Sequence, residues 1–311
     1  MSLPPEENLL PCPYALGSKF LLQVSPPIGS AYKALVTVQY AYTPFTVSPV
    51  MRVSLDFIVP VPDDPDQHFP RPPPEMVLRV YDRRFSLLLR ERHLVKPPTL
   101  RSEALYRQLI ASGQAPEADD ISGAITSHGS IKNCPVGLME HLMTLMVEPY
   151  FEDECAAYER LISLQGQDIP IFYGAPKFLD GLSIDDLDPP VPGILLEVVP
   201  GIPLDTINPT RTNVDAVIRS AIRIIDRYSE LGVLNEDVRL GNFILKPNDS
   251  VVMIDFAQSR LREDHETEEE WRNDKHMADE EGGISFQAKK KYNWQYVCTL
   301  KFYDPPKVPG K

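Results

Sequence analysis

The sequence predicts an α+β fold in which strands come first and helices follow. Short runs rich in β-branched and aromatic residues, bounded by Pro, Gly and Asp, occur up to about residue 205, and helical periodicity is clearest after it. A chain of 311 residues is long enough for two ordinary domains or for one two-lobed domain with a large core. The apolar fraction of 43% and the charged fraction of 24% are those of a globular protein.

Six segments have the composition or alternation of strands. They are 20–24, 33–42, 51–61, 75–82, 170–179 and 193–205. Three segments between them are expected to be irregular: a Pro-dense stretch at 62–74, a linker of small polar residues at 111–130 and a polar loop at 180–192.

Helical patterns occupy other parts of the chain. Residues 83–111 are basic and partly helical, a helix is expected at about 135–165, and 287–296 suggests a peripheral helix. The clearest helix begins at Thr212 or Asn213, either of which can cap it, and Gly232 closes it. Two acidic runs, 262–271 and 279–283, are expected to be solvated faces, the alternative being a regulatory or substrate-facing acidic surface.

The charge of the chain and its targeting features limit the classes of binding partner and the compartments that are expected. The net charge of −13 argues against nucleic acid or an anionic membrane as the main partner. The first residues lack a basic start, and no stretch approaches the roughly 18 apolar residues of a membrane span, so neither a signal peptide nor a transmembrane segment is expected. The four cysteines lack metal or disulfide spacing and are expected to be reduced. These features predict a cytoplasmic or nuclear protein.

The segment 234–257, LNEDVRLGNFILKPNDSVVMIDFA, carries the most specific chemistry. Asp237 is followed by Asn242 five positions later and by Asp255 thirteen positions after that, at the end of an apolar run. These oxygen-bearing side chains suit phosphoryl transfer, because one carboxylate can orient a hydroxyl while an amide and a second carboxylate hold Mg²⁺ against phosphates. The alternative is a polar turn followed by a β-hairpin that ends in a buried Asp.

This spacing resembles the catalytic loop and metal-binding motif of the protein-kinase-like superfamily. Together with VLRVYDRRF (77–85) and LLEVVPG (195–201), it is similar to uncharacterised fungal protein-kinase-like proteins. The resemblance implies a two-lobed protein-kinase-like fold with an antiparallel N-lobe sheet, a shortened, mainly helical C-lobe and a cleft for ATP and Mg²⁺. The implied divisions are a flexible 1–17, an N-lobe at 18–199 with insertions at about 43–75 and 83–135, and a minimal C-lobe at 200–311.

The resemblance also assigns roles within the loop. Asp237 would orient or accept the proton of the acceptor hydroxyl, Asn242 and Asp255 would bind Mg²⁺, and Arg239 would add positive charge near the transferred phosphoryl group. Glu236 stands where many protein kinases have the Arg that receives a phosphorylated activation loop, so that form of control is not expected.

Nucleotide contacts are implied for Arg79, Glu154, Glu197, Val199 and Gly29. Arg79 stands where the family has a Lys, and Glu154 is the expected helix partner, with Glu159 as the competitor. The alternatives are a solvent-facing charge on an edge strand for Arg79, surface charges for the two glutamates, a plain buried strand at the hinge and ordinary turn chemistry around Gly29.

The expected function is therefore an ATP- and Mg-dependent phosphotransferase. Only 54 residues follow Ala257, too few for a full protein-kinase C-lobe, so a small molecule is as plausible an acceptor as a protein Ser or Thr. The alternative is a pseudokinase that acts as a nucleotide-binding or scaffolding module, which Arg79 and the replacement of the usual Gly by Ala257 favour.

Overall fold

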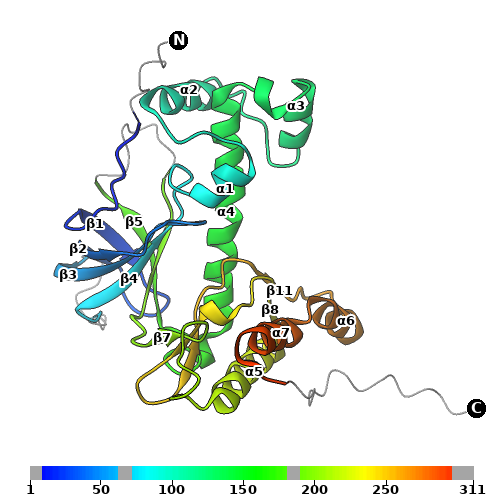
Figure 1. Ribbon diagram of the computed structural model, residues 1–311. Helices are drawn as coiled ribbons and strands as arrows, with labels where there is room; N and C mark the ends of the chain where they lie inside the picture. Colours follow the sequence, from blue (N-terminus) through cyan, green and yellow to red (C-terminus); the bar gives the residue numbers. More distant parts are fainter. Residues whose placement is uncertain (1–8, 62–71, 181–189, 296–311) are drawn as a thin grey trace, which may run out of the picture. The chain divides into compact units, whose positions relative to one another are not determined.

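The computed structural model describes residues 9–61, 72–180 and 190–295 and divides the chain into two compact units (Figure 1). Unit 1 comprises Met1–Glu152 and Phe172–Val198, and unit 2 comprises Asp153–Ile171 and Val199–Lys311. Helix α4 (Val136–Arg160) begins in unit 1 and ends in unit 2. The predicted α+β class is confirmed. Residues 62–71 of the Pro-dense stretch and 181–189 of the polar loop lie outside the described residues.

Unit 1 is built on a closed antiparallel barrel. Its strand order is β1-β2-β3-β4-β6-β5, and β5 pairs back onto β1, so that Val24 lies opposite Pro176. The expectation of an open, kinase-like N-lobe sheet, and with it of a two-lobed protein-kinase-like fold, is wrong, because both edges of this sheet are paired with each other. The strands are β1 (Lys19–Ser25), β2 (Tyr32–Ala41), β3 (Val50–Pro60), β4 (Glu75–Val80), β5 (Phe172–Phe178) and β6 (Gly193–Leu196).

A glycine permits this closure. Gly174 has φ +121°, and a Cβ atom at this position would lie 2.4 Å from the carbonyl oxygen of Ser25. Only a residue without a side chain therefore lets β5 approach the end of β1 so closely. Burial alternates along β1, β2 and β5, as the period of two requires, whereas β6 is buried throughout. The buried interior includes Leu22, Val24, Val36, Val53, Leu78 and Leu195.

One predicted strand is shorter than expected. The apolar segment at 193–205 forms β6 only as far as Leu196, and the next strand, β7 (Ile202–Pro203), belongs to a different sheet. Gly201 separates the two with φ +154°, where a Cβ atom would lie 2.2 Å from the carbonyl oxygen of Leu245.

The helices of unit 1 pack on the first part of α4. The expectation of a flexible linker at 111–130 is wrong, because residues 121–127 form α3. Ile121 is 4% exposed and packs with Leu138, Met139 and Leu142, and this apolar cluster holds α3 beside α4 (Figure 1). The other helices are α1 (Leu87–Arg92), α2 (Leu100–Ala111), α3 (Ile121–Ser127) and the 3-10 turn η1 (Ile131–Asn133).

Unit 2 contains the predicted long amphipathic helix, which is confirmed as α5 (Val214–Glu230). The side-chain Oδ1 of Asn213 caps it by accepting a hydrogen bond of 3.1 Å from the backbone of Ala216, and Gly232 follows its end with φ +80°. The remaining elements are η2 (Ile162–Leu164), β8 (Val233–Asn235), η3 (Leu240–Asn242), β9 (Phe243–Leu245), β10 (Val251–Met253), β11 (Ser259–Leu261), α6 (Glu268–Ala278) and α7 (Glu280–Tyr292).

The two acidic runs differ in their surroundings. Thr267 and Glu270 form a capping box at the exposed start of α6. At the start of α7, however, Glu280 and Glu281 are 4% and 3% exposed. The expectation that residues 279–283 form a solvated face is therefore wrong for these two glutamates, whose burial depends on partners described below.

Candidate functional site

The candidate site is the loop that joins β8 to β9, together with the residues that follow β10. The strands β9 and β10 pair antiparallel, and the backbone N–H of Ile254 donates to the carbonyl oxygen of Asn242 over 2.7 Å. The side-chain Nδ2 of Asn242 donates to the carbonyl oxygen of Asp237 over 3.0 Å. Unit 2 thus brings together Asp237, Asn242 and the segment that carries Asp255, as the spacing predicts.

The side chain of Asn235 ties the two halves of this site together. It is 1% exposed, its Oδ1 accepts from the backbone N–H of Asp237 over 2.9 Å, and its Nδ2 donates to the carbonyl oxygen of Asp255 over 2.8 Å. A buried amide with both ends satisfied fixes the two backbones relative to each other. Asn235 was not singled out from the sequence, although a polar residue that ends a buried strand is a usable signal.

The metal-ligand candidate Asp255 has an uncommon backbone conformation. Its φ is +74°, which is costly for a residue with a side chain, and its Oδ1 accepts from the N–H of Ala257 over 3.3 Å. The neighbouring Phe256 is fully buried against the edges of Tyr158 and Tyr228, with ring centroids 5.5 and 5.7 Å away. This packing holds the carboxylate of Asp255 at the end of the strand.

The predicted helix glutamate lies in the same unit. Glu154 on α4 is 0% exposed, and its Oε1 accepts from the backbone N–H of Phe256 over 3.2 Å. Its competitor Glu159 is exposed. The interpretation of Glu154 as a surface charge is therefore wrong, and its observed contact is with the backbone beside Asp255.

The predicted catalytic carboxylate has a cationic neighbour. Oδ2 of Asp237 lies 2.7 Å from Nη2 of Arg239, and about half of the arginine side chain is exposed. A partly exposed pair of this kind contributes little to stability. It does place a guanidinium group next to the carboxylate of Asp237, while the role of Arg239 toward a phosphoryl group stays a prediction.

Helix α7 supports the loop at two points. Oε1 of Gln287 accepts from the N–H of Leu240 over 3.0 Å, and its Nε2 donates to the carbonyl oxygen of Val238 over 3.2 Å. Oε1 of Glu280 accepts from the N–H of Asn235 over 2.8 Å and from the hydroxyl of Tyr228 over 2.5 Å. Sequence reasoning missed both α7 residues.

Burial controls the charge of Glu280. Removal from water raises the pKa of this carboxyl to about 8, against the lowering effect of the bonds from Tyr228 and Asn235. Burial likewise raises the pKa of Glu281, and it lowers the pKa of the neighbouring Lys275. Glu280 therefore makes these contacts, and a third between its Oε2 and the hydroxyl of Ser229 over 3.5 Å, as a neutral acid near pH 7.

The other nucleotide contacts predicted from sequence belong mainly to unit 1. Gly29 lies in the turn between β1 and β2 with φ +101°, Glu197 follows β6, and Val199 begins the second segment of unit 2. Arg79 lies on β4, which pairs with β3 on one side and β6 on the other, so the interpretation as an edge-strand charge is wrong. The assignment of these four residues to nucleotide binding stays a prediction.

Arg79 is held by neighbouring side chains within unit 1. The side chain is 8% exposed, its Nε donates to Oγ of Ser48 over 2.7 Å, and its guanidinium carbon lies 5.4 Å from the ring centroid of Tyr81. A flexible lysine would be held less tightly at this position.

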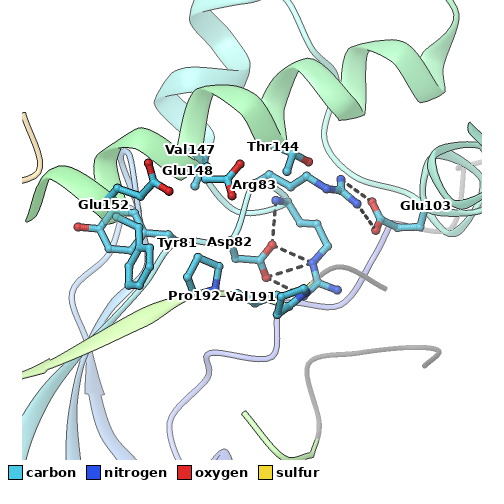
Figure 2. A pocket seen from close by; sticks show the side chains of 13 residues that line it. Tyr81, Asp82, Arg83, Glu103, Thr144, Val147, Glu148, Glu152, Val191 and Pro192 are labelled. Atoms are coloured by element: carbon cyan, nitrogen blue, oxygen red, sulfur yellow. Dashed lines mark hydrogen bonds and ion pairs between the residues drawn. The ribbon is translucent and has the colours of Figure 1, made fainter. Parts of the chain in front are cut away.

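A pocket of about 280 Å³ lies at the end of β4 (Figure 2). Figure 2 shows Arg83 directed toward Glu103, and the two side chains form an ion pair of 2.6 Å. Nη2 of Arg84 lies 2.8 Å from Oδ2 of Asp82. The hydroxyl of Tyr14 also donates to Asp82 over 2.7 Å. Because these charges have partners inside the protein, the cluster serves to attach helix α2 and the N-terminal segment to the barrel.

The comparisons with known proteins leave the site to be interpreted from its chemistry. No protein-family model matches the chain, and no curated protein matches it either. Within the described residues no three His, Cys, Asp or Glu side chains are grouped as a metal site would require. Among the helices of these same residues, none combines the length and apolarity needed to cross a membrane.

Proposed function

We propose that the loop site of unit 2 is the centre of an ATP- and Mg-dependent phosphotransferase. The observation that carries the proposal is the convergence of Asp237, Asn242 and Asp255, with Asn235 bonded to the backbones of both aspartates. The proposal rests on this geometry and on the spacing of the residues, and it does not depend on a kinase-like arrangement of lobes.

In the proposed reaction, a hydroxyl oxygen of the acceptor attacks the γ-phosphorus of ATP. A new O–P bond forms, the bond between the γ-phosphorus and the β,γ-bridging oxygen breaks, and ADP leaves with that bond's electron pair. The carboxylate of Asp237 accepts the hydroxyl proton. Arg239, whose guanidinium already lies beside this carboxylate, stabilises the negative charge of the transferred group.

The side chains present suit Mg²⁺. The amide nitrogen of Asn242 is bonded to Asp237, so its Oδ1 is the atom suited to a cation, and Asp255 supplies a carboxylate. Mg²⁺ usually takes only one or two protein ligands beside substrate phosphates and water, and these two residues meet that need without a larger acidic cluster. When bound, the ion neutralises phosphate charge.

A specific observation favours one alternative, a module that binds ATP without turning it over. Oδ1 of Asp255 already accepts a hydrogen bond from the N–H of Ala257, which stands where the resemblance expects a Gly. If this bond keeps the carboxylate away from the metal, the site binds nucleotide and transfers nothing.

The first test is nucleotide binding. We expect ATP with Mg²⁺ to raise the melting temperature of the wild type, because a ligand that binds only the folded state stabilises it. The shift should fall when EDTA removes the metal, and it should fall in Asp255→Asn. The matched control Asp249→Asn, an exposed position in the β9–β10 turn with φ +63°, should behave as the wild type. No shift with ATP and Mg²⁺ in the wild type would contradict both the phosphotransferase and the binding module.

A further inference from the structure

A second hollow, of about 660 Å³, lies directly beside the proposed catalytic loop within unit 2. It extends from the segment after β7, across η3, to the last turns of α7. This volume falls within the range of small-molecule sites. The residues that line it are Asp205, Arg239, Leu240, Gly241, Asn242, Gln287, Lys290 and Lys291.

The charge of this hollow is opposite to that of the chain. Arg239, Lys290 and Lys291 line the hollow with three cations, of which Arg239 is paired with Asp237, against the single carboxylate of Asp205. The whole chain, by contrast, carries −13. Among the residues that the structure describes, neither Lys290 nor Lys291 has an ion-pair partner. A concave surface with a positive local potential attracts anionic ligands, even when the protein as a whole is acidic.

Asp205 supplies a hydrogen-bond acceptor. Its Oδ1 is buried and has no hydrogen-bond partner within the described structure. The other oxygen, Oδ2, lies 3.5 Å from where a Cβ atom of Gly241 would be, so the carboxylate lies against the backbone of η3. A buried carboxylate oxygen without a donor is costly, and a hydroxyl of a bound molecule would satisfy it.

We propose that this hollow binds the phosphoryl acceptor, and that the acceptor is a small polyol carrying a phosphate or carboxylate group. Lys290 and Lys291 bind the anionic group, and Oδ1 of Asp205 accepts a hydrogen bond from one hydroxyl. Arg239 lines the hollow and contacts Asp237, so a second hydroxyl of the same molecule is directed toward the proton acceptor. The assignment as an acceptor site rests on the proposed function, whereas the anion binding does not.

The test is a calorimetric titration of the full chain without ATP, using glycerol 3-phosphate, glycerol and sulfate as probes. The double variant Lys290→Gln/Lys291→Gln is expected to bind glycerol 3-phosphate at least tenfold more weakly than the wild type. Lys289→Gln removes one positive charge from an exposed position on α7 that does not line the hollow, and its affinity should stay within about twofold of the wild type. Glycerol without the phosphate should not bind measurably.

The role of Asp205 has its own readout. Asp205→Ala should weaken the binding of glycerol 3-phosphate and leave that of sulfate, which has no hydroxyl to donate at neutral pH, undiminished. Equal affinities of the double variant and Lys289→Gln would overturn the proposal. So would an acidic peptide that binds tightly where glycerol 3-phosphate does not.

These outcomes are separate from the fate of the proposed function. Anion binding that depends on Lys290 and Lys291 without any ATP binding would refute the phosphotransferase and leave an anion site. ATP turnover that depends on Asp237, with no loss of glycerol 3-phosphate affinity in the double variant, would leave the enzyme and refute the acceptor site.

Discussion

Replacing Glu280 by Gln should remove most of the pH dependence of the stability of unit 2. The glutamine amide oxygen can accept the same two hydrogen bonds, from Tyr228 and from the backbone of Asn235, and its amide nitrogen occupies the place of the acid proton. At pH 5 the variant and the wild type should therefore have free energies of unfolding within about 1 kcal/mol of each other.

The size of the effect follows from the raised pKa. The folded chain holds a proton on Glu280 up to about pH 8, whereas the ordinary value is 4.5, so the folded state binds the extra proton between these limits. Stability then falls as pH rises through this window, by up to about 1.4 kcal/mol per pH unit. Between pH 5 and pH 8 the wild type should lose roughly 3 to 4 kcal/mol from this carboxyl alone.

Neighbouring groups also contribute to the profile. Burial raises the pKa of Glu281, which adds a loss of stability of the same sign, and it lowers the pKa of Lys275, which contributes with the opposite sign. The charges of Asp226 and Glu230 raise the pKa of Lys275 and so oppose the effect of its burial. Because Glu280 interacts with Glu281 and Lys275, the difference between the two profiles reports the titration of Glu280 together with its coupling to these two groups.

The assay is urea unfolding followed by tryptophan fluorescence from pH 5 to pH 8. Both tryptophans of the chain, Trp271 and Trp294, belong to unit 2, and Nε1 of Trp271 donates to the carbonyl oxygen of Ser229 over 3.4 Å. An exposed glutamate on α6 gives the control, since Glu269→Gln should keep the wild-type profile. Parallel profiles for the wild type and Glu280→Gln would refute the assignment of a buried neutral acid under the loop.

Three further substitutions test the fold and the site. Gly174→Ala should lower the stability of the barrel by about 3 kcal/mol or more, because the new methyl group meets backbone at a positive φ; circular dichroism melting should show it, whereas Gly123→Ala, at an open position within α3, should be no less stable than the wild type. Asn235→Ala removes the side-chain partner of two partly buried backbone groups, so it should cost about 1–3 kcal/mol and lower ADP formation, and full activity would show that these two hydrogen bonds are dispensable. Ile121→Ala should cost about 2–4 kcal/mol and speed proteolysis before α3, and an unchanged cleavage rate would contradict the role of its apolar cluster.

The local features of the fold were accessible from the sequence. Helix α5 has an apolar face at helical spacing, a capping Asn213 and a terminal Gly232, and these signals act over a few residues. The loop spacing likewise predicted that Asn242 and Asp237 would come together, because the intervening chain is too short to separate them.

Long-range pairing was not accessible in the same way. Barrel closure pairs Val24 with Pro176, and the sequence around either residue carries no signal for this pairing. The position of Gly174 is consistent with a close approach of two backbones, but it does not identify the partner strand. The burial of Glu280 was not predicted, because an acidic run usually faces solvent. Its hydrogen bonds with Tyr228 and Asn235 offset the cost of burying the carboxyl group. The role of Gln287 was also missed, because its contacts with the loop depend on the tertiary position of α7.

The central claim is that Asp237 accepts a proton during phosphoryl transfer from ATP. The most direct test is ADP formation from ATP and Mg²⁺ with glycerol 3-phosphate as acceptor, measured for the wild type, Asp237→Asn and the control Asp249→Asn. Loss of a general base typically costs a factor of about 10²–10⁴, so Asp237→Asn should lose at least about a hundredfold while Asp249→Asn keeps the wild-type rate. Equal rates for the wild type and Asp237→Asn would contradict the claim, and ATP binding without ADP formation in the wild type would favour the binding module instead.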